Sequence, residues 1–282
     1  MRKLSREARA AGKSIGLVPT MGALHAGHLS LLGAAREQNG FVAASIFLNP
    51  AQFAPGEDYK KYPRPLEKDL GLCAEAGVDA VFTPAAEEMY AKGVVMFIEP
   101  GLLADQLEGL SRPGHFRGVA PVVAKLFNIV EPDRAYFGRK DAQQLAVIRQ
   151  LVRDFDFGVE IVDCPTVREA DGLAVSSRNA CLSPKERQAA AGLYQALQAG
   201  QQLAAKGERR ATAIAAAMAE QIVEEPLAEL DYAAVVDPET FEDLEDLDRP
   251  ALAALAVRIG KTRLIDNAMV ELPRGRAKNA KK

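Results

Sequence analysis

Two histidines three residues apart are the most chemically suggestive feature of this sequence. His25 and His28 follow a short apolar run that ends at Pro19, and glycines stand at positions 22 and 27. A strand, a glycine turn and a helix start together present unpaired backbone N–H groups and the positive end of the helix dipole to an anion. Two imidazoles add directional donors for phosphate oxygens without a fixed charge. A simple turn with surface histidines is the alternative, but these are two of only three histidines in the chain, so the pattern favours phosphate chemistry.

A second glycine turn repeats this arrangement with a lysine. The segment 134–137 is expected to be a strand, Gly138 follows it, and Lys140 stands at the start of a helix expected over 142–154. The helix dipole disfavours a cation at that end, so a bound polyphosphate explains the lysine better than solvation does. Gln144, about one turn further on, is expected to point into the same site.

A third candidate is the run Ser-Ser-Arg-Asn at 176–179, which follows a glycine-containing segment. Two hydroxyls, a guanidinium and an amide in succession suit phosphate oxygens. Such a run alone is more often an ordinary polar loop. The combination with the two preceding motifs favours a phosphate-binding, flexible loop.

Polar residues also follow another apolar segment. Asn49 and Gln52 come just after the run at 41–48, where open α/β sheets bind ligands, although an ordinary strand-end turn is equally compatible. Arg112, His115 and Arg117 occupy a further polar turn, either as an anion-facing rim or as solvated loop residues.

The elements that must position these side chains alternate between strand and helix. The continuous apolar run at 41–48 is typical of a strand buried on both faces of a parallel sheet, and strand–helix–strand spacing predicts right-handed crossovers in a doubly wound sheet. The segment 89–99 is expected to be an edge segment or an excursion. The expected strands are 14–18, 41–48, 78–82, 134–137 and 159–162, and the expected helices are 29–38, 66–76, 119–130 and 142–154.

The composition changes beyond residue 183. An Ala/Gln/Glu-rich helical stretch over 184–224 precedes strands expected at 230–236, 251–259 and 262–265, with an acidic surface loop at 239–248. The sequence therefore predicts an α/β protein with a Rossmann-like, doubly wound parallel sheet over 1–177 and a smaller α+β domain over 178–282. The basic tail at 274–282 is expected to be disordered; a nucleic-acid arm is a weaker alternative because the body is acidic.

Composition excludes several other classes. A net charge of −3 and a pI near 5.8 give no basic surface of the kind nucleic-acid-binding proteins need. No apolar run is long enough to span a membrane, and the first nine residues suggest an exposed helix, not a signal peptide. The cysteines at 73, 164 and 181 lack zinc-site spacing. They are expected to be buried thiols in a reducing cytoplasm.

Five blocks of the sequence carry a wider pattern: Pro19–His28, Phe47–Phe53, Arg112–Val119, Phe137–Leu145 and Asp171–Asn179. Taken together they resemble the pantoate–β-alanine ligase (pantothenate synthetase) family. The first and last blocks are similar to the HIGH and KMSKS signatures of the wider HIGH-motif nucleotidyltransferase superfamily. The resemblance implies a Rossmann-like N-terminal domain, a small C-terminal lid domain, a homodimer, and ATP as a substrate with Mg²⁺. The chain departs from the family at Arg139, where an acidic or amide residue is common, and it begins in the first helix without a preceding strand.

The resemblance also implies roles for individual residues. His28 is implied as the proton donor, with His25, Lys140 and Arg178 as the other catalytic groups. Gln52 and Gln144 are implied to hold pantoate, and Gln52 also to contact β-alanine. The residues implied to bind ATP are Met21, Gly22, Ala23, Leu24, His25, Ala26, Gly27, His28, Gly138, Arg139, Lys140, Asp141, Val167, Val175, Ser176, Ser177 and Arg178.

The reaction implied is condensation of (R)-pantoate with β-alanine through a pantoyl adenylate, releasing AMP and pyrophosphate. The pantoate carboxylate would itself be the nucleophile, so no activated serine or cysteine is needed. One alternative is another nucleotidyltransferase of the superfamily that releases pyrophosphate but makes no amide. A catalytically idle nucleotide-binding module is a second, and an RNA-binding synthetase fragment is a third that the acidic pI disfavours.

Overall fold

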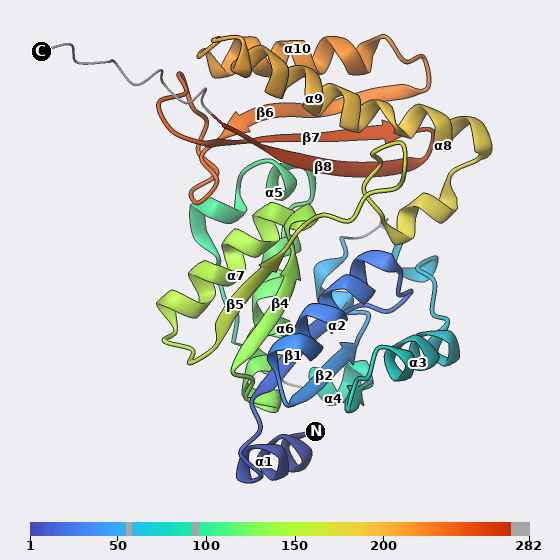
Figure 1. Ribbon diagram of the computed structural model, residues 1–282, viewed down its shortest axis with the longest axis vertical. Helices are drawn as coiled ribbons and strands as arrows, with labels where there is room; N and C mark the ends of the chain where they lie inside the picture. The colour runs from blue at the N-terminus through green and yellow to red at the C-terminus, as the bar shows by residue number, and fades with distance from the viewer. Residues whose placement is uncertain (55–57, 92–95, 272–282) are drawn as a thin grey trace, which may run out of the picture. The chain divides into compact units, whose positions relative to one another are not determined.

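The apolar segments of the N-terminal half pair as a five-stranded parallel sheet in the computed structural model, which describes residues 1–54, 58–91 and 96–271. The strand order is β3-β2-β1-β4-β5 (Figure 1). The order therefore reverses between β1 and β4, and open α/β sheets bind ligands beyond the carboxyl ends of the strands at such a point. The strands are β1 (Ile15–Thr20), β2 (Phe41–Ile46), β3 (Ala80–Phe82), β4 (Arg134–Gly138) and β5 (Glu160–Cys164).

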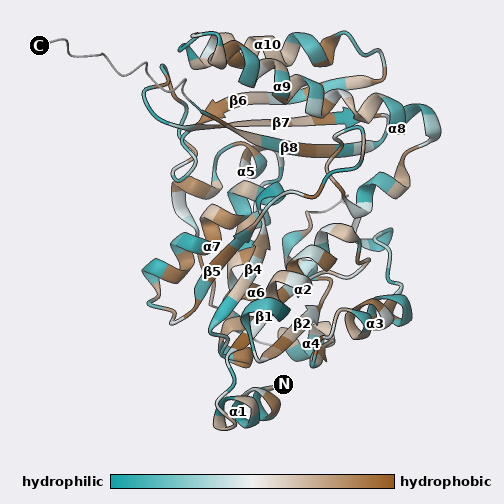
Figure 2. Cartoon of the chain, in the orientation of Figure 1, coloured by the Kyte–Doolittle hydropathy of each residue, from teal (hydrophilic) through white to brown (hydrophobic). Residues whose placement is uncertain are grey.

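Helices cover both faces of this sheet. Consecutive side chains of a strand point to opposite faces; Leu17 of β1 belongs to a core cluster with residues of α6 and α7, whereas Val18 belongs to a cluster with residues of α2 and α3. Helix α7 shows both hydrophobic and hydrophilic stretches in Figure 2, as expected of a helix with one buried side. The helices are α1 (Arg2–Ala10), α2 (Ala26–Gln38), α3 (Leu66–Glu75), α4 (Ala86–Met89), α5 (Glu108–Ser111), α6 (His115–Val130) and α7 (Ala142–Asp154).

The described chain divides into two compact units. The first contains Met1–Arg168 together with Val175–Ser177, and the second contains Glu169–Ala174 and the chain from Arg178 onward. In the second unit an antiparallel sheet of order β6-β7-β8 packs with α9 and α10 around a core that includes Leu197 and Met218. Its elements are α8 (Pro184–Ala190), α9 (Gly192–Ala205), α10 (Ala211–Val223), β6 (Ala228–Val236), β7 (Ala251–Ile259) and β8 (Thr262–Val270).

The expected elements are largely confirmed, and the differences have local causes. The strand expected from residue 78 begins at Ala80, because the Val78 N–H donates to the Cys73 carbonyl and completes the end of α3. The stretch 184–224 is three helices. Strand β8 extends to Val270 because it pairs with β7 along its whole length.

Three further expectations concern individual segments. In 89–99, Met89 ends α4 and the other described residues are in no strand, while 92–95 lie outside the described residues. The basic tail also lies outside them.

Cys73 and Cys164 are buried as expected, but Cys181 is exposed, so the prediction for that thiol was wrong. Within the part of the chain that the structure describes, no helix has the length and apolarity required to cross a membrane.

Candidate active site

The loop from Thr20 to His25 connects β1 to α2 through a left-handed turn (Figure 1). The Thr20 hydroxyl donates to the Ser45 carbonyl at 2.7 Å and accepts from the Gly22 N–H at 3.2 Å. Gly22 and Ala23 then have φ values of 84° and 52°. The left-handed region costs a residue with a side chain about 1–2 kcal/mol, so other contacts must hold Ala23 there.

A carboxylate that sequence reasoning missed provides those contacts. Asp69, in the first turn of α3, is 1% exposed. Its Oδ2 accepts from the Ala23 N–H and its Oδ1 from the Leu24 N–H, each at 2.8 Å. The expectation that this turn offers unpaired backbone donors to an anion is therefore wrong at these two positions. An acidic residue in a first helical turn is ordinary, so no sequence signal distinguished Asp69.

The two histidines form a capping pair at the start of α2. His25 is the N-cap, and its Nδ1 accepts from the Gly27 N–H at 3.2 Å. The Nδ1 of His28 accepts from the His25 N–H at 3.4 Å, and the ring centroids are 4.1 Å apart. A ring nitrogen that accepts carries no proton, so each neutral ring has its proton on Nε2. Both rings consequently present an Nε2–H donor.

Burial keeps both rings neutral at pH 7. The pKa of His28 is about 3, mainly because of burial; the His25 ring and the Lys140 ammonium also contribute to lowering this pKa, and Asp141 raises it. Burial also lowers the pKa of His25, with Lys140 lowering it and Asp141 raising it. In this state His28 is a hydrogen-bond donor and not an acid at neutral pH. The resemblance implies that His28 is a proton donor. In this neutral state it can donate a hydrogen bond through its Nε2–H group.

The low pKa of His28 makes folding dependent on pH. An unfolded histidine has a pKa of about 6.5, so below that pH the unfolded chain binds a proton that folded His28 does not. Stability is therefore fully present above about pH 6.5 and is lost as the pH falls towards 3. Between pH 7.5 and pH 5, we expect protonation of His28 in the unfolded chain to lower the free energy of unfolding by about 1–2 kcal/mol.

Denaturant titrations of the wild type and His28→Gln at both pH values test this. The loss on acidification should be smaller in the variant by that amount, while carboxylates contribute equally to both proteins. Equal losses in the two proteins would contradict the prediction.

Lys140 lies beside the histidine pair, beyond the end of β4. It belongs to the short turn η4 (Arg139–Asp141), its side chain is 18% exposed, and its Nζ is 3.6 Å from Asp141 Oδ1. Its effect on the pKa of both histidines places its charge close to them. The guanidinium of neighbouring Arg139 instead forms an ion pair with Asp163 of β5. The unusual cation at this position is therefore already neutralised by the next strand.

Gln52 lies in the turn η1 (Pro50–Gln52), beyond the carboxyl end of β2. Asn49 Nδ2 donates to Gln52 Oε1 at 3.1 Å and to the Gly118 carbonyl at 3.0 Å, and the Tyr90 hydroxyl donates to Asn49 Oδ1 at 2.8 Å. A Cβ on Gly118 would lie 2.1 Å from the Ala51 carbonyl oxygen, so the backbone of α6 packs directly on this turn. Asn49 and α6 thus orient the Gln52 amide.

The segment expected to be a polar turn instead contains the end of α5 and the first turn of α6, and it supports the same glutamine. His115 Nδ1 donates to the Gln52 carbonyl at 2.9 Å, and the Arg112 guanidinium donates to His115 Nε2 at 3.1 Å. Arg117 lies 3.5 Å from the Glu99 carboxylate and stacks over Phe97. The alternatives left open for these residues were an anion-facing rim and a solvated loop. The hydrogen bonds of His115 and Arg112 instead support the backbone of Gln52.

The two glutamines at the start of α7 differ in role. Gln143 is buried; its Oε1 accepts from the Glu108 N–H at 3.0 Å, and its Nε2 donates to the Leu103 and Gln106 carbonyls. It therefore fixes the segment before α6. Gln144 is partly buried and remains the candidate for ligand contact on this turn.

The first unit brings several predicted segments together. Gln52 Nε2 is 2.8 Å from Met21 Sδ, and the Val175 carbonyl lies 4.0 Å from where a Cβ on Gly27 would be. Val175 is itself held by its N–H bond to the Val167 carbonyl at 2.9 Å.

The serine run begins in this unit and leaves it. Ser177 Oγ is 3.3 Å from the hydroxyl of Tyr62, a buried side chain that the sequence analysis did not identify. Arg178 belongs to the second unit, within the turn η5 (Ser177–Cys181). Asn179 Nδ2 donates to the Ala174 carbonyl at 3.0 Å. Asn179 Nδ2 also donates to Glu169 Oε1 at 3.3 Å, so the run Ser-Ser-Arg-Asn has contacts within each unit.

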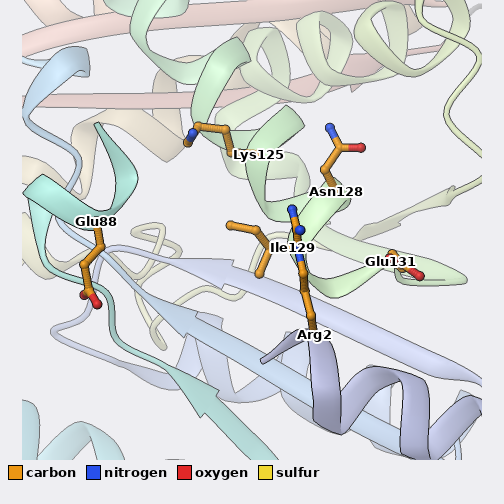
Figure 3. A pocket seen from close by; sticks show the side chains of 6 residues that line it. All are labelled: Arg2, Glu88, Lys125, Asn128, Ile129 and Glu131. Carbon is orange, nitrogen blue, oxygen red and sulfur yellow. The ribbon is translucent and has the colours of Figure 1, made fainter. Parts of the chain in front are cut away.

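A separate hollow of about 580 Å³ lies elsewhere in the first unit (Figure 3). Its lining comes from α1, α4 and the C-terminal half of α6. Helices α1 and α6 directly precede β1 and β4 in the chain and so lead into the amino ends of these strands. None of the candidate site residues lines it. The lining residues are Arg2, Glu88, Lys125, Asn128, Ile129 and Glu131.

Comparisons with known proteins find similar chains over almost the whole sequence. The family model described as pantoate-beta-alanine ligase matches residues 1–269. The pantothenate synthetase of Rubrobacter xylanophilus is 58% identical over 276 residues, covering 95% of both chains, and that of Moorella thermoacetica is 56% identical over 265 residues, covering 94% of both.

Solved structures are similar as well. The crystal structure of pantothenate synthetase from Thermus thermophilus matches with a TM-score of 0.90 and 50% identity, covering 95% of this chain and 98% of that one. The pantoate-beta-alanine ligase of Francisella tularensis, solved with beta-gamma ATP and beta-alanine, matches with a TM-score of 0.77 and 37% identity over 95% of both chains.

Proposed function

This chain belongs to the pantoate–β-alanine ligase family, and we infer that it activates pantoate with ATP at the loop that carries His25 and His28. It is an ATP-dependent ligase that condenses (R)-pantoate with β-alanine to pantothenate. The location is supported by two neutral imidazoles with Nε2–H groups that follow β1 and by Lys140, which follows β4. These residues lie beyond the carboxyl ends of neighbouring strands, and the Lys140 charge lowers the pKa of both rings. Such donors match the oxygens of a triphosphate.

In the first step the pantoate carboxylate attacks the α-phosphorus of ATP and pyrophosphate leaves. Negative charge builds on the non-bridging and leaving oxygens, where fixed N–H donors and a cation stabilise it. We assign that role to His25, His28, Lys140 and Arg178. Because the imidazoles are held by backbone bonds through Nδ1, they need little reorganisation when the charge develops.

In the second step the neutral amine of β-alanine attacks the acyl carbon, and AMP leaves. The amides of Gln52 and Gln144 suit a small hydroxy acid because each offers both a donor and an acceptor, and we assign pantoate to both and β-alanine also to Gln52. The remaining segments proposed for the nucleotide are Met21–His28, Gly138–Asp141, Val167 and Val175–Arg178. Residues 178–282 would act as a lid that shields the adenylate from water, with 1–177 binding ATP and pantoate.

Mg²⁺ is proposed to enter with the nucleotide. Among residues 1–54, 58–91 and 96–271, no group of three or more His, Cys, Asp or Glu side chains is placed to hold a metal ion. Mg²⁺ commonly keeps several waters and binds through substrate phosphates with one or two carboxylates. The described residues therefore offer no preformed cage, and no side chain is assigned to the ion.

We further propose that the enzyme is a cytoplasmic homodimer. The segment 96–110 of the first unit exposes Met96, Phe97, Leu102 and Leu110, with exposed fractions of 66–81%. Large apolar side chains gathered in one exposed segment favour a protein contact, and a second copy is the occupant that the family resemblance implies. Three free cysteines fit a reducing compartment.

The decisive experiment incubates the enzyme with ATP, (R)-pantoate and β-alanine and omits each in turn. Amide and AMP should form only with all three substrates, whereas exchange of pyrophosphate into ATP should require pantoate but not β-alanine. Pyrophosphate release that never yields AMP would identify the rival nucleotidyltransferase. ATP binding without any exchange would identify an idle nucleotide-binding module.

Gln144→Ala should raise the KM for pantoate about fivefold, the scale of one neutral hydrogen bond, and change the KM for ATP less than twofold. Initial rates with each substrate varied in turn measure both constants. Gln150→Ala is a matched control on the same helix, because Gln150 donates to Asp154 within α7. Equal changes in the KM for pantoate and the KM for ATP in Gln144→Ala would contradict the proposal that Gln144 binds pantoate.

A further inference from the structure

We propose that Asp69 is the positioning residue of the histidine loop: its carboxylate locks the turn that aims His25 and His28. The proposal rests on the proposed function for its kinetic consequence, but its structural consequence is measured without substrate. Asp69 is not itself among the residues proposed to contact a substrate; it acts through the loop, whose Ala23 and Leu24 N–H groups it binds.

The first support is the bidentate contact. Both carboxylate oxygens of Asp69 are engaged, one by the Ala23 N–H and one by the Leu24 N–H, at 2.8 Å each. The side chain is 1% exposed, so water does not compete for these bonds. Ionised acceptors of this kind make stronger hydrogen bonds than neutral ones.

The second support is the backbone that the contact fixes. Ala23 has φ at 52°, a conformation that persists only where surrounding contacts determine it. Gly22 packs against the same carboxylate, since a Cβ there would lie 3.1 Å from Asp69 Oδ2. The Asp69 contact thus spans the residues immediately before His25.

The third support is how the loop leads into α2. His25 caps the helix, and its own N–H reaches His28 Nδ1. A turn that relaxes before His25 moves the N-cap, and with it both rings. Displacements of about 1 Å at reacting groups can cost about 100-fold in rate, so a residue remote from the chemistry can control it.

The test compares Asp69→Asn with Glu67→Gln. The asparagine keeps the size of the side chain but turns an –NH2 donor toward one backbone N–H. Glu67 is an exposed carboxylate in the same helical turn and is the matched control. We expect Asp69→Asn to lower kcat at least tenfold while the KM for pantoate stays within about twofold, and Glu67→Gln to change neither.

A spectroscopic readout separates positioning from general destabilisation. His25, His28 and His115 are the three histidines of the chain, so their Cε1–H signals can be titrated individually by NMR. A loosened turn exposes His25 and His28 to water, so the pKa of His28 should rise from about 3 by at least about one unit, and the pKa of His25 should rise as well. Lys140 and Asp141, the charged groups that act on them, are unchanged. His115, which contacts the Gln52 carbonyl, should titrate as in the wild type.

Unaltered titration of His25 and His28 together with kcat within twofold of the wild type would overturn the proposal. A variant that does not fold is replaced by Asp69→Ser, whose hydroxyl can accept from only one of the two N–H groups and brings no opposing amide. A wild-type enzyme that makes no amide would overturn the proposed function instead. The NMR titrations would then still test whether Asp69 positions the histidine loop.

Discussion

Replacing His28 with alanine should slow formation of the pantoyl adenylate about 100-fold or more. The ring contributes a fixed Nε2–H donor, because its Nδ1 is held by the His25 N–H and its pKa of about 3 keeps it neutral. Loss of one preorganised donor to a developing oxyanion costs about 10²–10³ in kcat in other enzymes. The rate of pantoate-dependent exchange of pyrophosphate into ATP measures this step directly.

His28→Gln is the informative companion variant. The glutamine amide can place a neutral N–H close to the position of Nε2 but cannot carry a proton as an imidazolium does. We therefore expect it to recover a substantial part of the rate lost in His28→Ala. An unchanged exchange rate in His28→Ala would contradict a catalytic role for His28. A rate in His28→Gln as low as in His28→Ala would indicate that His28 transfers a proton and does not act only as a hydrogen-bond donor.

Lys140→Ala should have an effect of similar size, again about 100-fold on adenylate formation. The Lys140 side chain is only 18% exposed, so its interaction with a phosphate is weakly screened by water. Because Lys140 lowers the pKa of both histidines, its removal should also move their NMR titrations upward. That second effect follows from charge alone and needs no nucleotide.

Arg149→Ala is the matched control for this prediction. Arg149 is a cation of α7 whose guanidinium pairs with Asp163, and it is 42% exposed. Exposed ion pairs contribute little to stability, so this variant should exchange pyrophosphate within about twofold of the wild-type rate. Comparable losses in Arg149→Ala and Lys140→Ala would mean that the assay reports net charge and not a specific contact.

Much of the fold was predictable because it is encoded locally. The run Phe41–Leu48 has no polar interruption before Asn49 except Ser45, and such a run suits only a strand covered on both faces. Gly77 after an amphipathic stretch marks a helix end, and the structure has it at a φ of 73°. Such signals depend on neighbours in sequence.

The histidine pair was predictable for the same reason. Residues three apart at a helix start meet on one face whatever the rest of the chain does. The sequence alone therefore determined the parallel sheet, and it was enough to propose the carboxyl edge of that sheet as the site, with His25, His28 and Lys140 as candidate phosphate-binding groups.

The tertiary structure decided how those groups are held. Asp69 lies 46 residues from Ala23, and His115 lies 63 residues from Gln52, so only folding brings each pair together. The contact with Asp69 occupies the Ala23 and Leu24 N–H groups, which the sequence analysis expected to be available to an anion. Whether a donor is free and whether a histidine is charged depend on burial and on distant partners, which no local pattern of residues specifies.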